Sequence, residues 1–201
     1  MIVIVDYEAG NLASVYRAVE SLGFKAKISS DPEEIVAATK VIFPGVGAAG
    51  QAMSSLKERG LDEALQEVVV QGKGMLGICL GSQIILEKSE ENDTLCLSLL
   101  PGCTRKLPSR ASLKIPHMGW NQVNQIVQHP LFKAIPDKSD FYFVHSYYND
   151  VPSELILGST EYGISFPSVI GKDSVFAVQF HTEKSGKWGV QLLKNFLCME
   201  F

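Results

Sequence analysis

Gly77-Ile78-Cys79-Leu80-Gly81 decides the fold, because it places one thiol between two glycines at the end of an apolar run. Residues 74–78 are predicted to form a short buried strand, and residues 82–87 the first turns of a helix. Cys79 is therefore expected on a tight strand-to-helix turn, the nucleophile elbow, which strains its backbone and exposes its side chain. A side chain at either glycine would collide with the turned backbone. The helix N-terminus behind the sulfur favours the thiolate, the form that attacks.

An ordinary buried cysteine is the alternative interpretation of this pentapeptide, since free cysteines are frequent small core residues. A thiol nucleophile also needs a base and a group that orients the base. The rest of the chain must therefore supply a histidine and a carboxylate.

Strands and helices alternate regularly before the elbow. Strands are predicted over residues 1–6, 24–29 and 40–44, and helices over residues 12–22, from 31 onward, 51–59 and 61–71. From Gly102 onward the segments are short, β-rich and bounded by turns. This order predicts an α/β fold with a central, mostly parallel sheet, helices on both faces and an additional antiparallel or mixed β layer. Functional sites in such folds lie at the carboxyl ends of the strands.

The composition is that of one ordinary globular domain over residues 1–201, with 46% hydrophobic residues and no long Pro/Gly/Ser linker. The opening Met1–Val5 run is followed by Asp6 and lacks a basic leader, so we expect a strand there and neither a signal peptide nor a membrane span. A net charge of −4 without a basic stripe argues against nucleic acid. The four cysteines have no metal spacing, which favours a reducing cytoplasmic setting, no metal and no cofactor.

A glycine-rich loop, residues 44–50, follows the third predicted strand. The glycines at 45 and 47 would let successive backbone N–H groups point into a cleft, as an oxyanion hole requires. A phosphate-binding loop is a competing interpretation, but no Gly-Lys-Ser/Thr follows. A third interpretation is that these residues form only a turn that leads into the next helix.

The last predicted strand, residues 175–180, runs into His181-Thr182-Glu183. If the backbone stays extended there, His181 and Glu183 project to the same side, since side chains repeat with a period of two. The carboxylate could then fix the tautomer of the imidazole while the other ring nitrogen faces a thiol. His117, His129 and His145 lack such a carboxylate and are expected to be core or loop hydrogen-bonding groups.

Three segments together resemble the class I, triad-type glutamine amidotransferases: residues 44–47, 77–83 and 179–185. Within that family, residues 116–121 and 141–148 resemble the glutaminase subunits of imidazole glycerol phosphate synthases. The likeness covers nearly the whole chain. It implies a flavodoxin-like amidotransferase fold, and hydrolysis of L-glutamine to L-glutamate and ammonia without a cofactor.

The resemblance also implies residue roles. Cys79 would attack glutamine, His181 would pass its proton to the leaving ammonia, and Glu183 would orient His181. The oxyanion would be held by backbone N–H groups of the Gly45-Val46-Gly47 loop and of Leu80. The amino-acid end of glutamine would be held by Gln83, Glu91 and the backbone around Ser146 and Tyr147.

The resemblance further implies a heterodimer. The ammonia of these proteins passes through the (β/α)8 barrel of a cyclase subunit, which makes imidazole glycerol phosphate and an aminoimidazole carboxamide ribotide in histidine biosynthesis. Family members are typically weak glutaminases until the partner binds its nucleotide. The positions expected at the interface are Asn11, Trp120, Tyr142 and Lys184.

Three departures from the usual family pattern bear on the tuning of the site: Thr182 in place of proline, Ser82 in place of methionine, and Ala48-Ala49 after the glycine loop. None removes a reacting group. Two other interpretations stay open at this point: a glutaminase or cysteine hydrolase of the same fold from another pathway, and a catalytically silent partner that regulates another protein.

Overall fold

The computed structural model describes residues 1–8, 11–109 and 113–201. Its strands are β1 (Ile2–Val5), β2 (Ala26–Ser29), β3 (Lys40–Gly45), β4 (Gly74–Cys79), β5 (Lys88–Ser89), β6 (Thr94–Leu95), β7 (Cys103–Lys106), β8 (His117–Gln125), β9 (Ser139–His145), β10 (Tyr147–Asp150), β11 (Ile156–Glu161), β12 (Ser165–Lys172) and β13 (Val175–Val178). Its helices are α1 (Leu12–Ser21), α2 (Pro32–Ala37), α3 (Ala49–Glu58), α4 (Leu61–Val70), α5 (Leu80–Ile84) and α6 (Gly186–Cys198), with 3-10 turns η1 (Glu91–Asp93), η2 (Pro130–Phe132), η3 (Ser153–Leu155) and η4 (Thr182–Lys184).

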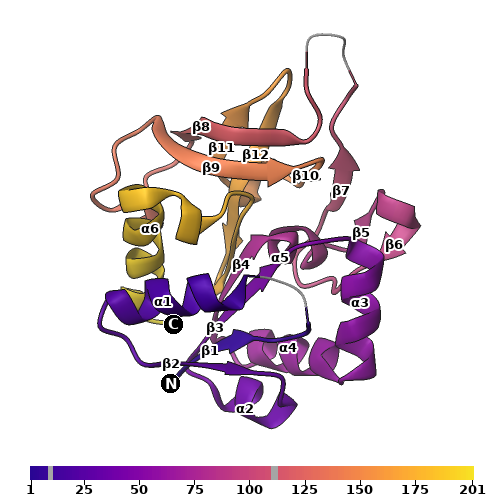
Figure 1. Ribbon diagram of the computed structural model, residues 1–201, viewed down its shortest axis with the longest axis vertical. Helices are drawn as coiled ribbons and strands as arrows, with labels where there is room; N and C mark the ends of the chain where they lie inside the picture. The colour runs from indigo at the N-terminus through magenta and orange to yellow at the C-terminus, as the bar shows by residue number, and fades with distance from the viewer. Residues whose placement is uncertain (9–10, 110–112) are drawn as a thin grey trace.

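Within the described residues these strands form two sheets (Figure 1). The larger has nine strands in the order β2-β1-β3-β4-β13-β12-β11-β8-β9, and the smaller has four in the order β10-β7-β5-β6. Strands β2, β1, β3, β4 and β13 pair in parallel, whereas β13, β12, β11, β8 and β9 pair antiparallel. The predicted α/β class, with a parallel sheet that continues into a mixed layer, is confirmed.

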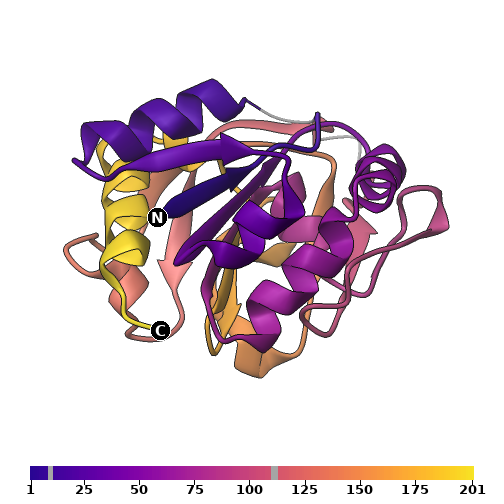
Figure 2. The same cartoon turned by 90° about the horizontal axis from the view of Figure 1, so that it is seen from below.

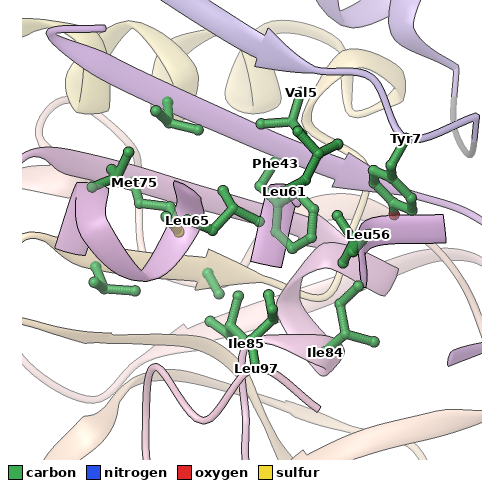
Figure 3. Packing of buried hydrophobic residues seen from close by; sticks show 14 of the residues in the cluster. Val5, Tyr7, Phe43, Leu56, Leu61, Leu65, Met75, Ile84, Ile85 and Leu97 are labelled. Carbon is green, nitrogen blue, oxygen red and sulfur yellow. The ribbon is translucent and has the colours of Figure 1, made fainter. Parts of the chain in front are cut away.

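Hydrophobic side chains alternate between the two faces of the parallel strands, as a strand buried on both sides requires. Val3 and Val5 pack on one face with residues of α2, α3 and α4, and Phe43 and Met75 join this cluster (Figure 3). Ile2 and Ile4 pack on the opposite face with residues of α1 and α6. Helices therefore cover both faces of the sheet, with α1 and α6 side by side on one of them (Figure 2).

Two helix boundaries follow from local sequence signals. Asp31 caps α2, where its side chain accepts a hydrogen bond of 2.9 Å from the backbone N–H of Glu33, and Pro32 is the first helical residue. Gly23 follows the end of α1 with φ +83°, the left-handed conformation that glycine adopts readily. Both boundaries agree within one residue with the helices predicted over residues 12–22 and from residue 31 onward.

One local prediction was wrong. Helix α5 begins at Leu80 and ends at Ile84, so it starts two residues earlier and is shorter than the pattern of residues 82–87 suggests. The elbow itself starts the helix, because Cys79 is the N-cap residue of α5. Residues 88–93 contain β5, which belongs to the smaller sheet, and the 3-10 turn η1. No helix in the part of the chain that the structure describes is long and apolar enough to cross a membrane.

Candidate active site

Cys79 lies at the strand-to-helix turn between β4 and α5, with φ 55° and ψ −111°. Such a conformation is costly for a non-glycine residue and is kept only where the surroundings enforce it. The flanking glycines show why: a Cβ on Gly81 would lie 1.9 Å from the carbonyl oxygen of Phe43, and one on Gly77 would lie 2.9 Å from that of Gly81. The backbone atoms of β3 and α5 therefore leave one tight path for the chain around the sulfur.

His181 reaches the same sheet edge because β13 lies beside β4 in parallel. Its Nδ1 lies 2.9 Å from Oε1 of Glu183, and both side chains are almost fully buried. The backbone is not extended through this segment, contrary to the prediction, since Thr182–Lys184 form the 3-10 turn η4. The turn still brings imidazole and carboxylate together. It is anchored to β9, because the His181 N–H donates to the Tyr142 carbonyl at 2.9 Å and the Tyr142 N–H donates to Ser185 Oγ at 2.9 Å.

The imidazole of His181 favours its protonated form. Burial alone opposes the charge, but hydrogen bonds with Cys79 and Glu183 and the negative charges of these two groups outweigh it. The pKa of His181 is thereby raised from 6.5 to about 9. At neutral pH the site therefore holds an imidazolium beside the sulfur.

The glycine loop of residues 45–47 runs alongside Cys79, because Gly45 pairs with Cys79 in the β3–β4 ladder. A Cβ on Gly45 would lie 2.0 Å from the Tyr7 hydroxyl and 3.1 Å from Cβ of Leu80, so no side chain fits there. Gly47 has φ +98°, a conformation that side chains strongly disfavour. The loop thus brings backbone next to the sulfur where a bulkier sequence could not.

A cavity of about 370 Å³ opens over Cys79 and His181. It brings together predicted residues from segments far apart in the chain: Val46, Gly47, Cys79, Leu80, Gln83, Glu91, Ser146, Tyr147, His181 and Lys184. Gly45 and Glu183 do not line the cavity. Pro116, Val144 and His145 complete the lining.

Gln83 and Glu91 are held in place by hydrogen bonds to their neighbours. The Gln83 amide nitrogen donates to the Tyr147 carbonyl at 3.0 Å and to Oε1 of Gln179 at 2.9 Å. Glu91 accepts a hydrogen bond of 2.6 Å from the backbone N–H of Ala49, the first residue of α3. A carboxylate at a helix N-terminus is electrostatically favourable, so Glu91 is fixed at the rim of the cavity.

Two groups around the site were missed by sequence reasoning. The Val144 carbonyl oxygen lies 3.8 Å from Cys79 Sγ, and the fully buried Gln179 holds Gln83. Gln179 stands two residues before His181, so its closeness was visible in the sequence, but its hydrogen bond depends on the packing of α5 against β13. Ser82, one of the noted departures, donates from its hydroxyl to the Cys79 carbonyl at 2.7 Å.

The four positions expected at an interface lie outside the cavity, except for Lys184 at its edge. Trp120 is 58% exposed and stacks edge-on against Tyr142, with ring centroids 5.9 Å apart. Asn11 is exposed just before α1, a helix that packs against η4. Trp120 also lies next to Gly186, the first residue of α6, which follows η4 in the sequence. A solvent-facing surface with an exposed tryptophan therefore borders the cavity.

Known proteins resemble this chain along nearly its whole length. The family model for "Glutamine amidotransferase class-I" matches residues 3–199. A protein of Dehalococcoides mccartyi named imidazole glycerol phosphate synthase subunit HisH is 48% identical over 99% of this chain and 97% of its own length. A protein of Maridesulfovibrio salexigens with the same name is 50% identical over 98% of this chain and 95% of its own length.

Solved structures share the fold at low sequence identity. A crystal structure titled as a glutamine amidotransferase superimposes with a TM-score of 0.76 at 18% identity, covering 98% of this chain and 97% of its own. PurLQS from Thermotoga maritima gives a TM-score of 0.77 at 17% identity, covering 98% and 96%. The chain belongs to the class-I glutamine amidotransferase family.

Proposed function

We infer that this chain is the glutaminase subunit of an imidazole glycerol phosphate synthase. The observation that carries the inference is sequence identity: about half of the residues, over nearly the full length, are identical to those of relatives that bear that subunit's name. The cavity over Cys79 and His181 supports the reaction, since it combines a cysteine sulfur, a protonated imidazole and buried polar groups. No feature of the described residues favours a silent scaffold.

In the first step the Cys79 thiolate attacks the carboxamide carbon of glutamine. The carbonyl oxygen becomes an oxyanion, held by backbone N–H groups of the residue 45–47 loop and of Leu80. His181 then gives its proton to the amide nitrogen, the C–N bond breaks, and ammonia leaves. The raised pKa of His181 supports this role, because the proton is already present at neutral pH.

In the second step water hydrolyses the γ-glutamyl thioester. The imidazole, now neutral, takes a proton from the attacking water, and the C–S bond breaks to give glutamate and the free sulfur. Glu183 holds Nδ1 of His181 throughout, so Nε2 is the nitrogen that faces the sulfur and the substrate. Gln83, Glu91 and the Ser146–Tyr147 backbone would hold the amino-acid end of glutamine.

The partner would cover the surface around Asn11, Trp120, Tyr142 and Lys184. Tryptophan and tyrosine are frequent anchors in protein interfaces. Ammonia would then pass directly into a (β/α)8 cyclase subunit, with the whole chain acting as one amidotransferase domain. All four cysteines are free, in keeping with the reducing cytoplasm.

The test is glutamate release from glutamine in three mixtures: this chain alone, with a cyclase subunit, and with that subunit and its nucleotide ligand. Strong release in the full mixture alone supports both the reaction and its coupling to the partner. Equal release in all three would retain the glutaminase and remove the histidine-pathway assignment. No release from a folded complex would refute the proposed reaction.

A further inference from the structure

Two buried histidines beside the cavity take no part in the proposed chemistry. His117 on β8 and His145 on β9 are 3% and 5% exposed, and they face each other as a register pair of the antiparallel ladder. His117 Nδ1 lies 2.9 Å from His145 Nε2, a hydrogen-bond distance. One nitrogen must donate and the other accept, so the protons on this pair are not arbitrary.

The neighbours of His145 decide its tautomer. His145 Nδ1 lies 2.7 Å from the carbonyl oxygen of Tyr147, which can only accept a hydrogen bond. The proton is therefore on Nδ1. In a neutral imidazole Nε2 is then bare, and it must accept from Nδ1–H of His117.

Asn121 demands the same polarity from the other end. Its Oδ1 accepts from the Gln122 N–H at 2.8 Å, and its Nδ2 donates to the Glu161 carbonyl at 2.9 Å, so the orientation of the amide is fixed. The same Nδ2 lies 3.2 Å from His117 Nε2, which must be bare to accept. The chain Asn121, His117, His145, Tyr147 thus has one direction, with one proton on each imidazole.

Burial keeps both imidazoles neutral. It lowers the pKa of His117 from 6.5 to about 4. It also lowers the pKa of His145 to about 3, against the hydrogen bond to Tyr147; the positive charge of His181, and that of His117 whenever it is protonated, act in the same direction as burial. His117 is stacked between Tyr162 and Phe143, at centroid distances of 3.9 Å and 4.9 Å, which holds the plane of its ring. A second proton on either ring would set donor against donor.

The series of hydrogen bonds from Asn121 through the two histidines ends at the wall of the active-site cavity. The Tyr147 carbonyl accepts from His145 Nδ1 and also from the Gln83 amide, whereas the Ser146 carbonyl accepts from the Leu107 N–H at 2.9 Å. Ser146, Tyr147 and Gln83 all line the cavity. The orientation of this stretch of backbone therefore depends in part on the Nδ1–H donor of His145.

We propose that His117 and His145 are positioning residues for glutamine: as a neutral pair with fixed tautomers, they hold the Tyr147 carbonyl against Gln83 and so fix the wall that receives the substrate's amino-acid end. Neither histidine touches the reacting atoms. The proposal rests on the proposed function, because it assigns that wall to glutamine. Loss of the hydrogen bonds that link Asn121, His117, His145 and Tyr147 should weaken substrate binding more than the chemical step.

Two replacements of His117 separate hydrogen bonding from packing. Asparagine places an amide N–H near the position of Nδ1 and keeps a donor for His145, whereas leucine removes it. In the complex with the cyclase subunit and its ligand, we expect His117→Leu to raise the KM for glutamine about tenfold, as the loss of one buried hydrogen bond allows. The kcat should change less, and His117→Asn should lie near the wild type. His129→Asn is the matched control, since His129 does not line the cavity.

A second readout needs neither substrate nor partner. The chain has four histidines, so 15N-histidine labelling gives few NMR signals to assign. We expect His117 and His145 as neutral Nδ1–H tautomers, with a nitrogen–nitrogen coupling across their hydrogen bond. An Nε2–H tautomer on either ring, or no coupling, would overturn the pair.

The combined outcomes separate the claims. Coupling in the wild type with an unchanged KM in a folded His117→Leu variant, even one with a lower melting temperature, would overturn the positioning role and leave a structural one. Equal KM values for the leucine and asparagine variants would also contradict it. A wild-type complex without any glutamate release would refute the proposed function, while the NMR data would still judge the histidine pair.

Discussion

His181 and His145 line the same cavity and are similarly inaccessible to solvent, 4% and 5% exposed, yet at neutral pH His181 is a cation and His145 is neutral. The pKa of His181 is raised to about 9, and that of His145 is lowered to about 3. Their partners make the difference: a carboxylate and a sulfur face His181, whereas a carbonyl and a neutral imidazole face His145. Burial makes a charge expensive, and the hydrogen-bond partner decides whether the charge is kept.

Cys79→Ala removes the sulfur from one side of this comparison and should have the largest effect. We expect glutamine-dependent synthesis by the complex to be abolished, because no other described side chain replaces the nucleophile. Synthesis from added ammonia, which needs only the partner, should continue. Product formation with glutamine and with an ammonium salt checks both, and loss of both would contradict the proposed division of labour.

Glu183→Gln removes the carboxylate and should make His181 resemble His145. The glutaminase kcat/KM should fall about 10²–10⁴-fold, since the imidazolium loses its orienting anion. The pKa of His181 should fall as well, which an NMR titration of the histidines would show. Glu154→Gln, at an exposed position in η3, serves as the control. A Glu183→Gln enzyme with wild-type activity would remove Glu183 from the mechanism.

Gly81→Ala tests the backbone that brings the sulfur to His181 and leaves the histidine pair in place. The new Cβ would meet the Phe43 carbonyl at 1.9 Å, so we expect a loss of about 1–3 kcal/mol in the free energy of unfolding. Gly50→Ala, in helix α3, is the matched control. A Cβ at this position would lie 3.4 Å from its nearest neighbour, Oγ1 of Thr94, which is an ordinary contact. Urea unfolding of both variants measures the difference. Equal stabilities would show that the elbow relaxes freely.

The two histidine sites should also give stability opposite pH dependences. Below pH 6.5 the unfolded chain takes up protons that folded His117 and His145 refuse, so stability falls toward pH 4 by about 1.4 kcal/mol per unit for each fully excluded proton. His181 contributes stability below pH 6.5, and this is lost as the pH rises through about 9.

Chemical unfolding across this pH range checks the two limbs separately. The double variant His117→Asn/His145→Asn should flatten the acid limb, and Glu183→Gln should flatten the alkaline one. If the variants shift the curves without changing their slopes, the assignment of the limbs to these histidines is wrong.

The sequence predicts the parallel half of the molecule well, because each strand and helix there carries its own pattern. The elbow follows from two glycines around Cys79, and the α2 start follows from Asp31-Pro32. The antiparallel half is harder, since cross-strand register has no local signal: nothing in the sequence pairs His117 with His145, 28 residues away.

The candidate site shows the same limit. His181 and Glu183 were found as neighbours, but the extended backbone expected between them is a 3-10 turn, because Ser185 and Tyr142 anchor the segment to β9. Gln179 was missed since its role appears only when α5 packs against β13. Residues that act through long-range contacts need the fold to become visible.

The measurement that tests the account most directly is a 15N titration of the four histidines in the wild-type chain from about pH 5 to about pH 10. The signals of His181 are those that a His181→Asn variant lacks. We predict that His181 stays protonated until about pH 9, while His117 and His145 stay neutral over this range. A His181 that loses its proton near 6.5, or a His145 that gains one there, would contradict the charge arrangement on which the proposed glutaminase chemistry depends.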